Sequence, residues 1–591
     1  MKKNKLSKIF VIFYVGLLIT SCSDFLDRRS PSYDSDGFYE TEAGIRDGVV
    51  GVYNCIYMDN VFASHCPTVI YLDHFTGLCV ERNQNTTIGA GAGCTPDNAK
   101  IQAYWSSLYT IIARANAVIY GASKRISNMS DAAKQYYSEA KVLRAYAYYN
   151  LISTWGDVPF FTEPVTVDEY DAAKVSKVKI LDFVIEDLED AANYLPWMAS
   201  ERGRVDKAVA YGLEARAGLL GGSLNYDGKG SDYFKIAAES SGKVIGKRHL
   251  AANYSDLFTL TGQAKSDVRD EMLWELMYSS AGTQNYHWVG LGQASRNYGQ
   301  SGRHPTSLLA DTYECVDGKR IDESPLYDPK HPNWNRDPRF EATLRMHNDT
   351  VDYYTTTGVN KVIINAYDAQ TKFYSGSGNF WFYSANKDIN STAAWTSFVN
   401  AGCGYLWQKY TGETIESLSA QTCNIAVMRY AEILLTYAEA KIELGEFKDQ
   451  SVYDAINAVR NRAGMPSVSD DKKDSQDKMR QLVRRERKVE LIMEGLHFAD
   501  MRRWGIGDLE NEHPCYGIPL SSIKYEGMTD IPNYVTDTRH DLNDIASYEN
   551  YKDKLKVRDA NRYWDSKFAL WPIPQIEIDR DPNIIQNDGY K

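Results

Sequence analysis

Apolar residues recur at helical spacing through the first half of the chain and again near residue 440. The clearest stripe runs from Tyr430 to Ile442, with apolar residues at i, i+3, i+4, i+7, i+8 and i+12, so that all fall on one helix face. Gly445 is expected to end this helix, because glycine adopts the left-handed conformation that often follows a last turn. The same spacing predicts helices over residues 41–57, 105–120, 131–155, 177–195, 206–220, 233–245 and 452–462.

Small residues on neighbouring predicted helices, such as Ala438 and Ala455, allow close approach and favour paired antiparallel helices like tetratricopeptide units. Helical spacing is lost over residues 251–426, where Gly, Asn, Ser, Thr and aromatic residues alternate, as in residues 375–383. We interpret this region as long loops with short strands. Residues 60–99 and 505–591 are also loop-rich. The pattern therefore predicts a helical scaffold that carries an irregular face, and long loops on such a face usually serve function.

The first 22 residues are typical of an export signal. Lysines at positions 2, 3, 5 and 8 precede an apolar run over residues 9–19, which is shorter than the ~20 residues that a membrane-spanning helix needs. The run ends in Leu-Ile-Thr-Ser-Cys at residues 18–22, which resembles a bacterial lipobox. We predict that Cys22 is acylated and becomes the mature N-terminus, anchored by acyl chains that contribute ~0.8 kcal/mol per buried methylene. An ordinary signal peptide with a chance cysteine is the alternative.

The net charge of −12 argues against a nucleic-acid surface, which needs clustered lysine and arginine. The 42 tyrosines and 12 tryptophans exceed a usual aromatic load and suit flat faces that dock ligands as well as a core. Eight cysteines follow Cys22, an even number that permits disulfides in an exported protein, but their pairing cannot be deduced from spacing. No C-x-x-C pair and no His or Cys pair at metal-ligand spacing occurs, so we predict no metal site.

The sequence contains none of the H-E-x-x-H, G-x-S-x-G, P-loop or G-x-G-x-x-G motifs, and we predict no catalytic residues. Because the chain has 78 carboxylates, the sequence does not exclude a pair of them that acts as in a glycosidase.

Several short motifs occur in a fixed order along the chain. They are CSDFLD at 22–27, EAKVLRAY at 139–146, WGDVP at 155–159, PT at 305–306, DGK at 317–319, NRDPRF at 335–340, RER at 485–487, EG at 494–495, FADMRRWG at 498–505, WPIPQ at 571–575, PN at 582–583, QN at 586–587 and GY at 589–590. Together they resemble the SusD/RagB family of nutrient-uptake lipoproteins of Bacteroidetes, over residues 22–591.

The resemblance implies a mainly α fold in which four tetratricopeptide-like helix pairs pack against a large loop-rich half with short strands. The expected divisions are a lipoprotein signal peptide at 1–21, an N-terminal helical part at 22–250 with a loop-rich insertion near 60–99, and a C-terminal part at 251–591. The last comprises an irregular ligand-facing region at 251–426, a helix pair at 427–463, a signature helix at 475–505 and a loop-rich end at 506–591.

The arginine-rich runs 484–488 and 502–503 suggest an anion site, but a structural role is favoured. Arg487 lies three and seven residues before Glu490 and Glu494, so the opposite charges are expected to share a helix face. Because these runs belong to the matched motifs, we expect buried ion pairs that tie this helix to its neighbours.

The resemblance also implies a function. Family members bind oligosaccharides, or in some cases peptides, as the lid of a SusC-like TonB-dependent outer-membrane barrel. We therefore predict a glycan-binding surface lipoprotein in the outer membrane that is not an enzyme and has no cofactor besides its lipid; a structural Ca²⁺ is left open. A RagB-like peptide receptor, a surface hydrolase and a purely structural lid are the alternatives.

A sugar site needs exposed rings for the C–H faces and polar side chains for the hydroxyl rim. Three segments of the irregular regions have that mixture, although ordinary loop packing would also explain it. By contrast, Trp105, Trp155, Trp504 and Trp571 lie in matched motifs or helices and are expected in the core. The candidate ligand-binding residues are Asp73, His74, Arg82, Asn83 and Asn85; Tyr286, Trp288, Arg296, Asn297 and Tyr298; and Trp381, Tyr383, Asn386 and Trp395.

Overall fold

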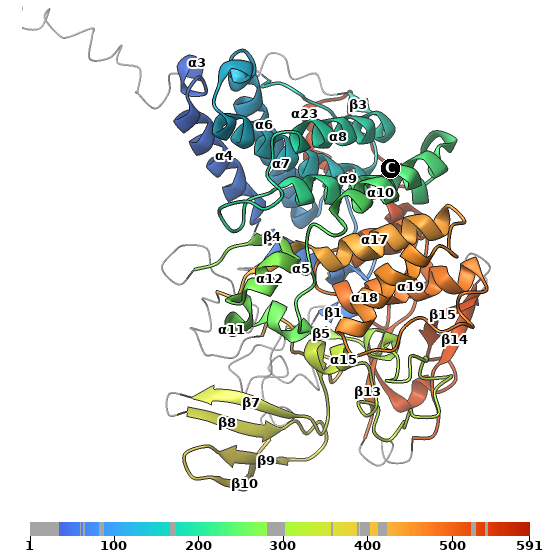
Figure 1. Cartoon of the computed structure of the whole chain (residues 1–591). Coiled ribbons are helices and arrows are strands. Elements are labelled where there is room, and N and C mark those ends of the chain that lie inside the picture. The colour runs from blue at the N-terminus through green and yellow to red at the C-terminus, as the bar shows by residue number, and fades with distance from the viewer. Residues whose placement is uncertain are drawn as a thin grey trace, which may run out of the picture.

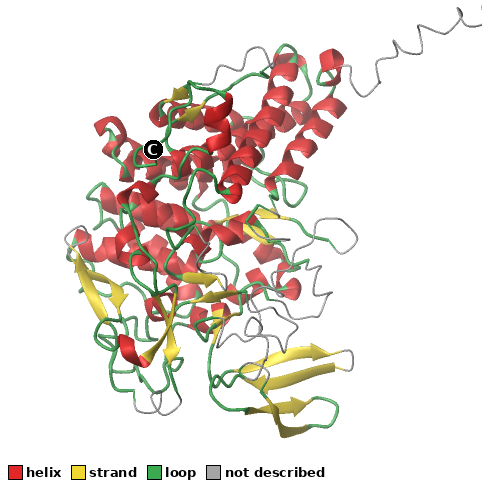
Figure 2. Cartoon of the chain, turned by 180° about the vertical axis from the view of Figure 1, so that it is seen from behind, coloured by secondary structure: helices red, strands yellow, loops and turns green. Residues whose placement is uncertain are grey.

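The computed structural model describes most of the chain. The described residues are 35–58, 61–62, 66–81, 88–165, 173–279, 302–355, 358–386, 389, 402–411, 422–521, 528–537 and 542–590. Helices fill the upper and central parts of the molecule in Figure 1, and most strands lie in its lower part, as Figure 2 shows from behind. The predicted fold class, mainly α with a loop-rich half, is confirmed.

Every helix predicted from the apolar spacing is present, with ends that differ by a few residues. The helix predicted at 131–155 has those bounds, and the stripe at 430–442 lies in a helix that ends before Gly445, whose φ of +80° is left-handed. The helices are α3 (Ser35–Phe38), α4 (Glu42–Ile56), α5 (Thr68–Leu72), α6 (Ala99–Ser123), α7 (Asp131–Trp155), α8 (Lys177–Ala192), α9 (Lys207–Ser223), α10 (Gly230–Val244), α11 (Leu260–Gln263), α12 (Ser266–Glu271), α14 (Ser307–Thr312), α15 (Pro338–Thr343), α17 (Tyr430–Glu443), α18 (Gln450–Arg462), α19 (Gln476–Leu491), α20 (His497–Arg503), α21 (Gly507–Asn511) and α23 (Gln575–Arg580).

Side-chain caps explain where many of these helices begin. The hydroxyls of Thr41 and Ser130 and the carboxylate of Asp206 accept hydrogen bonds from backbone N–H groups in the first turns of α4, α7 and α9. Such caps satisfy donors that have no partner inside the helix. The predicted signature helix over 475–505 is divided, since α19 ends at Leu491 and α20 begins at His497.

Neighbouring helices pack in antiparallel pairs, as the small residues predicted. Helices α6 and α7, α8 and α9, α9 and α10, and α17 and α18 lie against one another (Figure 1). One continuous hydrophobic cluster runs from α4 to residue 584 and joins both halves. Trp105, Trp155, Trp504 and Trp571 are at most 5% exposed, which confirms their predicted place in the core.

The C-terminal residues close onto the end of α7. The indole Nε1 of Trp155 donates to the carbonyl of Pro572 at 2.9 Å. The side-chain amide of Asn587 donates to the carbonyls of both Trp155 and Trp571 at 2.8 Å. A helix of the N-terminal half is therefore completed by the last residues of the chain.

Among the described residues, the strands form small antiparallel sheets, of which six have two strands and one has four. The two-stranded sheets pair β1 (Cys79–Glu81) with β5 (Arg303–Pro305), β2 (Val158–Pro159) with β3 (Lys174–Val175), β4 (Met272–Leu276) with β12 (Ile425–Arg429), β6 (Leu344–Arg345) with β11 (Leu406–Trp407), β13 (Cys515–Pro519) with β16 (Leu555–Arg558), and β14 (Asn533–Asp537) with β15 (Leu542–Ser547).

The four-stranded sheet projects from the lower end of the molecule (Figure 1). Its order is β10-β9-β8-β7, from β7 (Thr350–Thr355), β8 (Gly358–Ile363), β9 (Gln370–Ser375) and β10 (Phe380–Ala385), so β10 is an edge strand. We call residues 350–385 the aromatic lobe. The sequence predicted loops with short strands here, and the lobe is more regular than that prediction.

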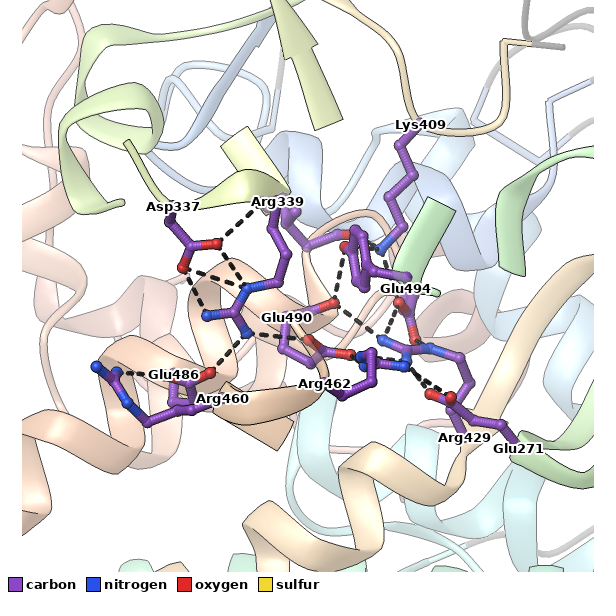
Figure 3. A network of polar contacts seen from close by, with 12 residues as sticks. Glu271, Asp337, Arg339, Lys409, Arg429, Arg460, Arg462, Glu486, Glu490 and Glu494 are labelled. Atoms are coloured by element: carbon purple, nitrogen blue, oxygen red, sulfur yellow. Dashed lines mark hydrogen bonds and ion pairs between the residues drawn. The ribbon is translucent and has the colours of Figure 1, made fainter. Parts of the chain in front are cut away.

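A network of charged side chains lies buried where α17, α18 and α19 meet the loop-rich half (Figure 3). Arg429, which is 0% exposed, pairs with Glu271 at 2.6 Å, with Glu490 at 2.9 Å and with Glu494 at 2.8 Å. We call the following residues the ion network: the cations Arg339, Lys409, Arg429, Arg460 and Arg462, and the anions Glu271, Asp337, Glu486, Glu490 and Glu494.

The predicted role of the arginine-rich runs is confirmed, but the predicted partners are wrong. Arg487 pairs with Asp500 at 2.9 Å rather than with Glu490 or Glu494. Glu494 lies beyond the end of α19, so it cannot share that helix face, and it binds Arg429 and Lys409 instead. The helix is thus tied to its neighbours, as expected, by pairs between elements instead of pairs along it.

The eight cysteines after Cys22 are free thiols, and seven of them are buried. Within the described ranges, no helix combines the length and the apolar character needed to cross a bilayer. Nor do the described His, Cys, Asp and Glu residues gather in groups of three that could hold a metal ion.

Candidate functional site

Asp73, predicted as a ligand contact, has a structural role instead. It lies in the short 3-10 helix η1 (Asp73–Phe75) and is 0% exposed. Its carboxylate accepts hydrogen bonds from the backbone N–H groups of Met493 at 2.7 Å, Gly495 at 3.2 Å and Phe498 at 3.3 Å. Burial raises its pKa to about 6, against the lowering effect of these bonds. Asp73 therefore fixes the turn between α19 and α20.

His74 was also predicted as a ligand contact and is likewise buried. It is 3% exposed, and its ring stacks on Tyr71 at 5.3 Å and meets the edge of Trp407 at 6.1 Å. Burial holds the pKa of His74 well below its usual value, so the ring is neutral. The sequence suggested a loop here, but the apolar run of α5 is wholly buried and carries η1 into the core with it.

Most other predicted contacts lie outside the described residues: Arg82, Asn83, Asn85, Tyr286, Trp288, Arg296, Asn297, Tyr298 and Trp395. The described residues that flank these segments, however, meet at one place. In the β1–β5 ribbon, Glu81 is the register partner of Arg303. Next to it, Gly402 lies against the ring of His304, whose Nδ1 is 3.2 Å from the carbonyl oxygen of Tyr405. Described residues that are distant in sequence, Glu81, Arg303 and Gly402, therefore meet at one ribbon.

The outer end of this ribbon combines a ring with charges. The Arg303 guanidinium lies 4.9 Å from the centroid of the Tyr71 ring and pairs with Glu81 at 3.2 Å. The Tyr71 hydroxyl donates to the same carboxylate. Arg303 is only 8% exposed, so this cluster is largely buried.

Asn386 from the third predicted cluster is also structural. It is 0% exposed, and its side-chain amide donates to the carbonyls of Asn365 at 2.6 Å and Asp368 at 2.8 Å. These bonds hold the turn that leads into β9, because a buried amide needs partners of this kind. Its polar atoms face the backbone instead of a ligand.

Trp381 and Tyr383, by contrast, are 45% and 63% exposed on the edge strand β10 of the aromatic lobe. The register places Trp381 beside Tyr374 of β9, with ring centroids 5.4 Å apart, and Tyr383 beside Lys372, whose ammonium lies 5.5 Å from the tyrosine ring. Because side chains alternate along a strand, these four share one face. We call Tyr374, Trp381, Tyr383 and Lys372 the mixed face.

The opposite face of the lobe carries phenylalanines that the sequence interpretation missed. Phe373 stacks on Phe382 at 5.8 Å, and Phe380 and Phe382 are 55% and 39% exposed. We call these three the phenylalanine face. The period-two alternation of the aromatic run 380–383 was the available signal, since it puts neighbouring rings on opposite sides of a strand.

The two faces differ in what they can bind. The mixed face offers rings that can stack on the C–H faces of a sugar, together with a tyrosine hydroxyl and an ammonium group for its hydroxyls. The phenylalanine face has only the hydroxyls of Thr371, Ser375 and Ser384 beside its rings on β9 and β10, and no charged group on these two strands. Among the predicted contacts that the structure describes, the mixed face alone has this chemistry in reach of solvent.

Comparisons with known proteins agree with this architecture. The model of the SusD family matches residues 270–590, and a second model, described as starch-binding associating with outer membrane, matches residues 24–219. The SusD-like protein P2 of Formosa agariphila is 24% identical over the whole length of both chains. The match to the SusD-like protein P25 of the same organism spans 51% of that protein. The starch-binding protein SusD of Bacteroides thetaiotaomicron is 24% identical over 77% of this chain and 72% of its own.

Solved structures share the fold. A SusD-like carbohydrate binding protein from Bacteroides fragilis superimposes with a TM-score of 0.71 at 24% identity, over 93% of this chain and 99% of its own. Surface glycan-binding protein A from Bacteroides uniformis gives 0.60 at 18% identity, over 93% of this chain and all of its own.

Proposed function

This chain belongs to the SusD family, and from that premise we propose that it is a glycan receptor of the bacterial cell surface. In this role it covers a SusC-like TonB-dependent outer-membrane barrel as a lid and delivers oligosaccharide to it. The description of the N-terminal family model as starch-binding and associating with the outer membrane supports both the ligand class and the place.

The observation that carries the proposal is the mixed face of the aromatic lobe. Trp381 and Tyr383 are large rings that are exposed on a regular strand. Their exposed apolar surface does not stabilise the fold, and exposed apolar patches often mark binding sites. A glycan laid along β10 would cover both rings and bring its hydroxyls to Lys372.

Calorimetry against a panel of oligosaccharides tests this assignment. We expect Trp381→Ala to weaken binding about tenfold, the effect of losing one stacking contact of ~1.4 kcal/mol, with the same thermal unfolding as the parent. Trp334→Ala is the matched control, because Trp334 is 56% exposed outside the lobe. Equal affinities of parent and Trp381→Ala for every bound sugar would contradict the mixed face as the site.

A peptide ligand is the second candidate, and the edge position of β10 favours it. An edge strand presents unpaired backbone groups to which an extended peptide can add as a further strand. Peptides and oligosaccharides should therefore be titrated in parallel. Binding of peptides alone would replace the glycan proposal with a peptide receptor of the same kind.

We propose binding without catalysis, and without a cofactor other than a lipid. Release of product from any glycan or peptide by the purified protein, lost when one carboxylate is replaced, would contradict this.

Membrane attachment is proposed through Cys22, which lies outside the described residues. Cys22→Ala should move the protein from the membrane fraction to the soluble fraction and abolish labelling by radioactive palmitate. Persistent labelling of the variant would place the lipid elsewhere.

A further inference from the structure

A cavity of about 680 Å³ opens between α10, α17 and α18. These helices lie right of centre in Figure 1, whereas the aromatic lobe projects at the lower left, so the cavity is separate from the mixed face. A volume of this size falls in the range of small-molecule sites, ~300–1,000 Å³. Nothing in the function proposed above uses it.

The floor of the cavity is one face of α17. Tyr430, Leu434 and Tyr437 line it at i, i+4 and i+7. The two tyrosines are seven residues apart, which places them about 10 Å from each other along the helix axis. Tyr430 and Leu434 are only 6% and 5% exposed, so Tyr437, which is half-buried, provides the ring that a sugar can contact, and Tyr430 contributes its hydroxyl.

The cavity has space between its walls because the flanking helices carry small residues there. Gly242 of α10 and Ala455 and Ala458 of α18 line the cavity. A methyl group added at Gly242 would make an ordinary contact, 3.8 Å from the Tyr437 ring, without displacing it. The cavity therefore lies over α17, between α10 and α18.

Polar groups surround this aromatic floor. The Tyr430 hydroxyl accepts the backbone N–H of Gly246 at 3.2 Å, and the Tyr437 hydroxyl lies 3.0 Å from that of Ser451. The exposed carboxylate of Asp454 and the imidazole of His249, whose Nδ1 is bound to Asp270 at 2.8 Å, stand at the rim. Hydroxyl, carboxylate and imidazole groups around tyrosine rings can satisfy the hydroxyls of a sugar, whereas an apolar helix would leave them without partners.

We propose that this cavity is a second carbohydrate site, which takes a short oligosaccharide across the ring of Tyr437 and beside the hydroxyl of Tyr430. It shares its ligand class with the function proposed above and rests on it, but it lies on the helical scaffold. Each chain would then hold glycan at two places, and a long polysaccharide that reached both would bind more tightly than a short one.

Calorimetry with maltohexaose, xylohexaose and laminarihexaose tests the proposal, with Ala458→Trp as the main variant. Ala458 is exposed on α18, so an indole there fills the cavity without entering the core. We expect the parent to bind two molecules per chain, Ala458→Trp to bind one, and Trp381→Ala to keep two sites, one of them weakened about tenfold. Lys235→Trp on the exposed side of α10 is the control and should bind two.

Tyr430→Phe provides a second, milder variant, because it keeps the ring and removes only the hydroxyl. It should weaken the cavity site about threefold to tenfold, the usual effect of one neutral hydrogen bond.

The outcomes separate this inference from the proposed function. A single site that is weakened in Trp381→Ala and unchanged in Ala458→Trp overturns the inference and leaves the mixed face. A single site lost only in Ala458→Trp supports the cavity and contradicts the mixed face. Absence of binding to all three sugars overturns the inference. The inference is also overturned if Ala458→Trp changes only the capture of a partner protein and leaves sugar binding unchanged.

Discussion

The ion network and the aromatic lobe place their side chains in opposite ways. Charged side chains that usually face water lie at 0–4% exposure around Arg429, while the rings of Trp381 and Tyr383, which usually pack inside, face solvent. The network has five cations and five anions in mutual contact, so each charge has replaced water with an opposite charge. The rings of Trp381 and Tyr383, by contrast, remain in contact with water. The first region therefore serves the fold, and the second is available to a ligand.

The largest loss of stability is expected from a variant that removes the centre of the ion network. Arg429→Ala should lower the free energy of unfolding by about 4 kcal/mol, because Glu271, Glu490 and Glu494 would stay buried without their common partner. Urea denaturation followed by circular dichroism measures this.

Arg46→Ala is the control, since Arg46 pairs with Asp47 on the surface, where both side chains are at least half exposed. Its effect should stay below about 1 kcal/mol. Similar losses in the two variants would show that the buried network contributes no more than a surface pair.

Glu490→Gln should have a smaller effect, about 3 kcal/mol at neutral pH, and one that depends on pH. Burial alone would raise the pKa of Glu490, but Arg462, Arg429 and Arg339 hold it at about 2. Because the pKa of Glu490 is lower in the folded state than its unfolded value of about 4.5, the ionised carboxylate stabilises the fold at pH values above 4.5. This contribution is lost as the pH falls toward 2. The difference between parent and variant in urea should therefore shrink over this range. A difference that is constant from pH 7 to pH 3 would contradict the ionised state.

The smallest effect is expected on the phenylalanine face. Phe380→Ser should change the free energy of unfolding by less than about 0.5 kcal/mol, because the ring is 55% exposed. It should also reduce self-association at high concentration, measured by light scattering, since an apolar edge strand favours edge-to-edge pairing. A loss of stability near that of Arg429→Ala would mean that the lobe is part of the core.

The helices could be predicted because their signals are local. The stripe from Tyr430 to Ile442 and the caps at Thr41 and Ser130 depend on residues a few positions apart. The partners of the charged residues could not be found in this way. Arg487 has Glu490 and Glu494 close in sequence, yet it binds Asp500 of the next helix, because tertiary packing decides which carboxylate reaches it.

The candidate site was predicted in part. Trp381 and Tyr383 are exposed, as a ligand contact requires, but Asp73, His74 and Asn386 are buried. Residue type alone cannot distinguish a polar side chain that faces solvent from one that satisfies buried backbone groups, since both kinds occur in polar, irregular sequence. The lobe was underestimated because Gly and Ser at its hairpin obscured two flanking strands.

The contact between Trp155 and the residues near Asn587 has a consequence for the order in which the molecule forms. A ribosome makes residues 571–587 more than 400 positions after α7. The N-terminal helices can associate early, but the end of α7 lacks these contacts until residues 571–587 have been made. Contacts between residues so far apart in sequence slow folding, and cleavage of the chain before residue 571 would remove the partners of Trp155.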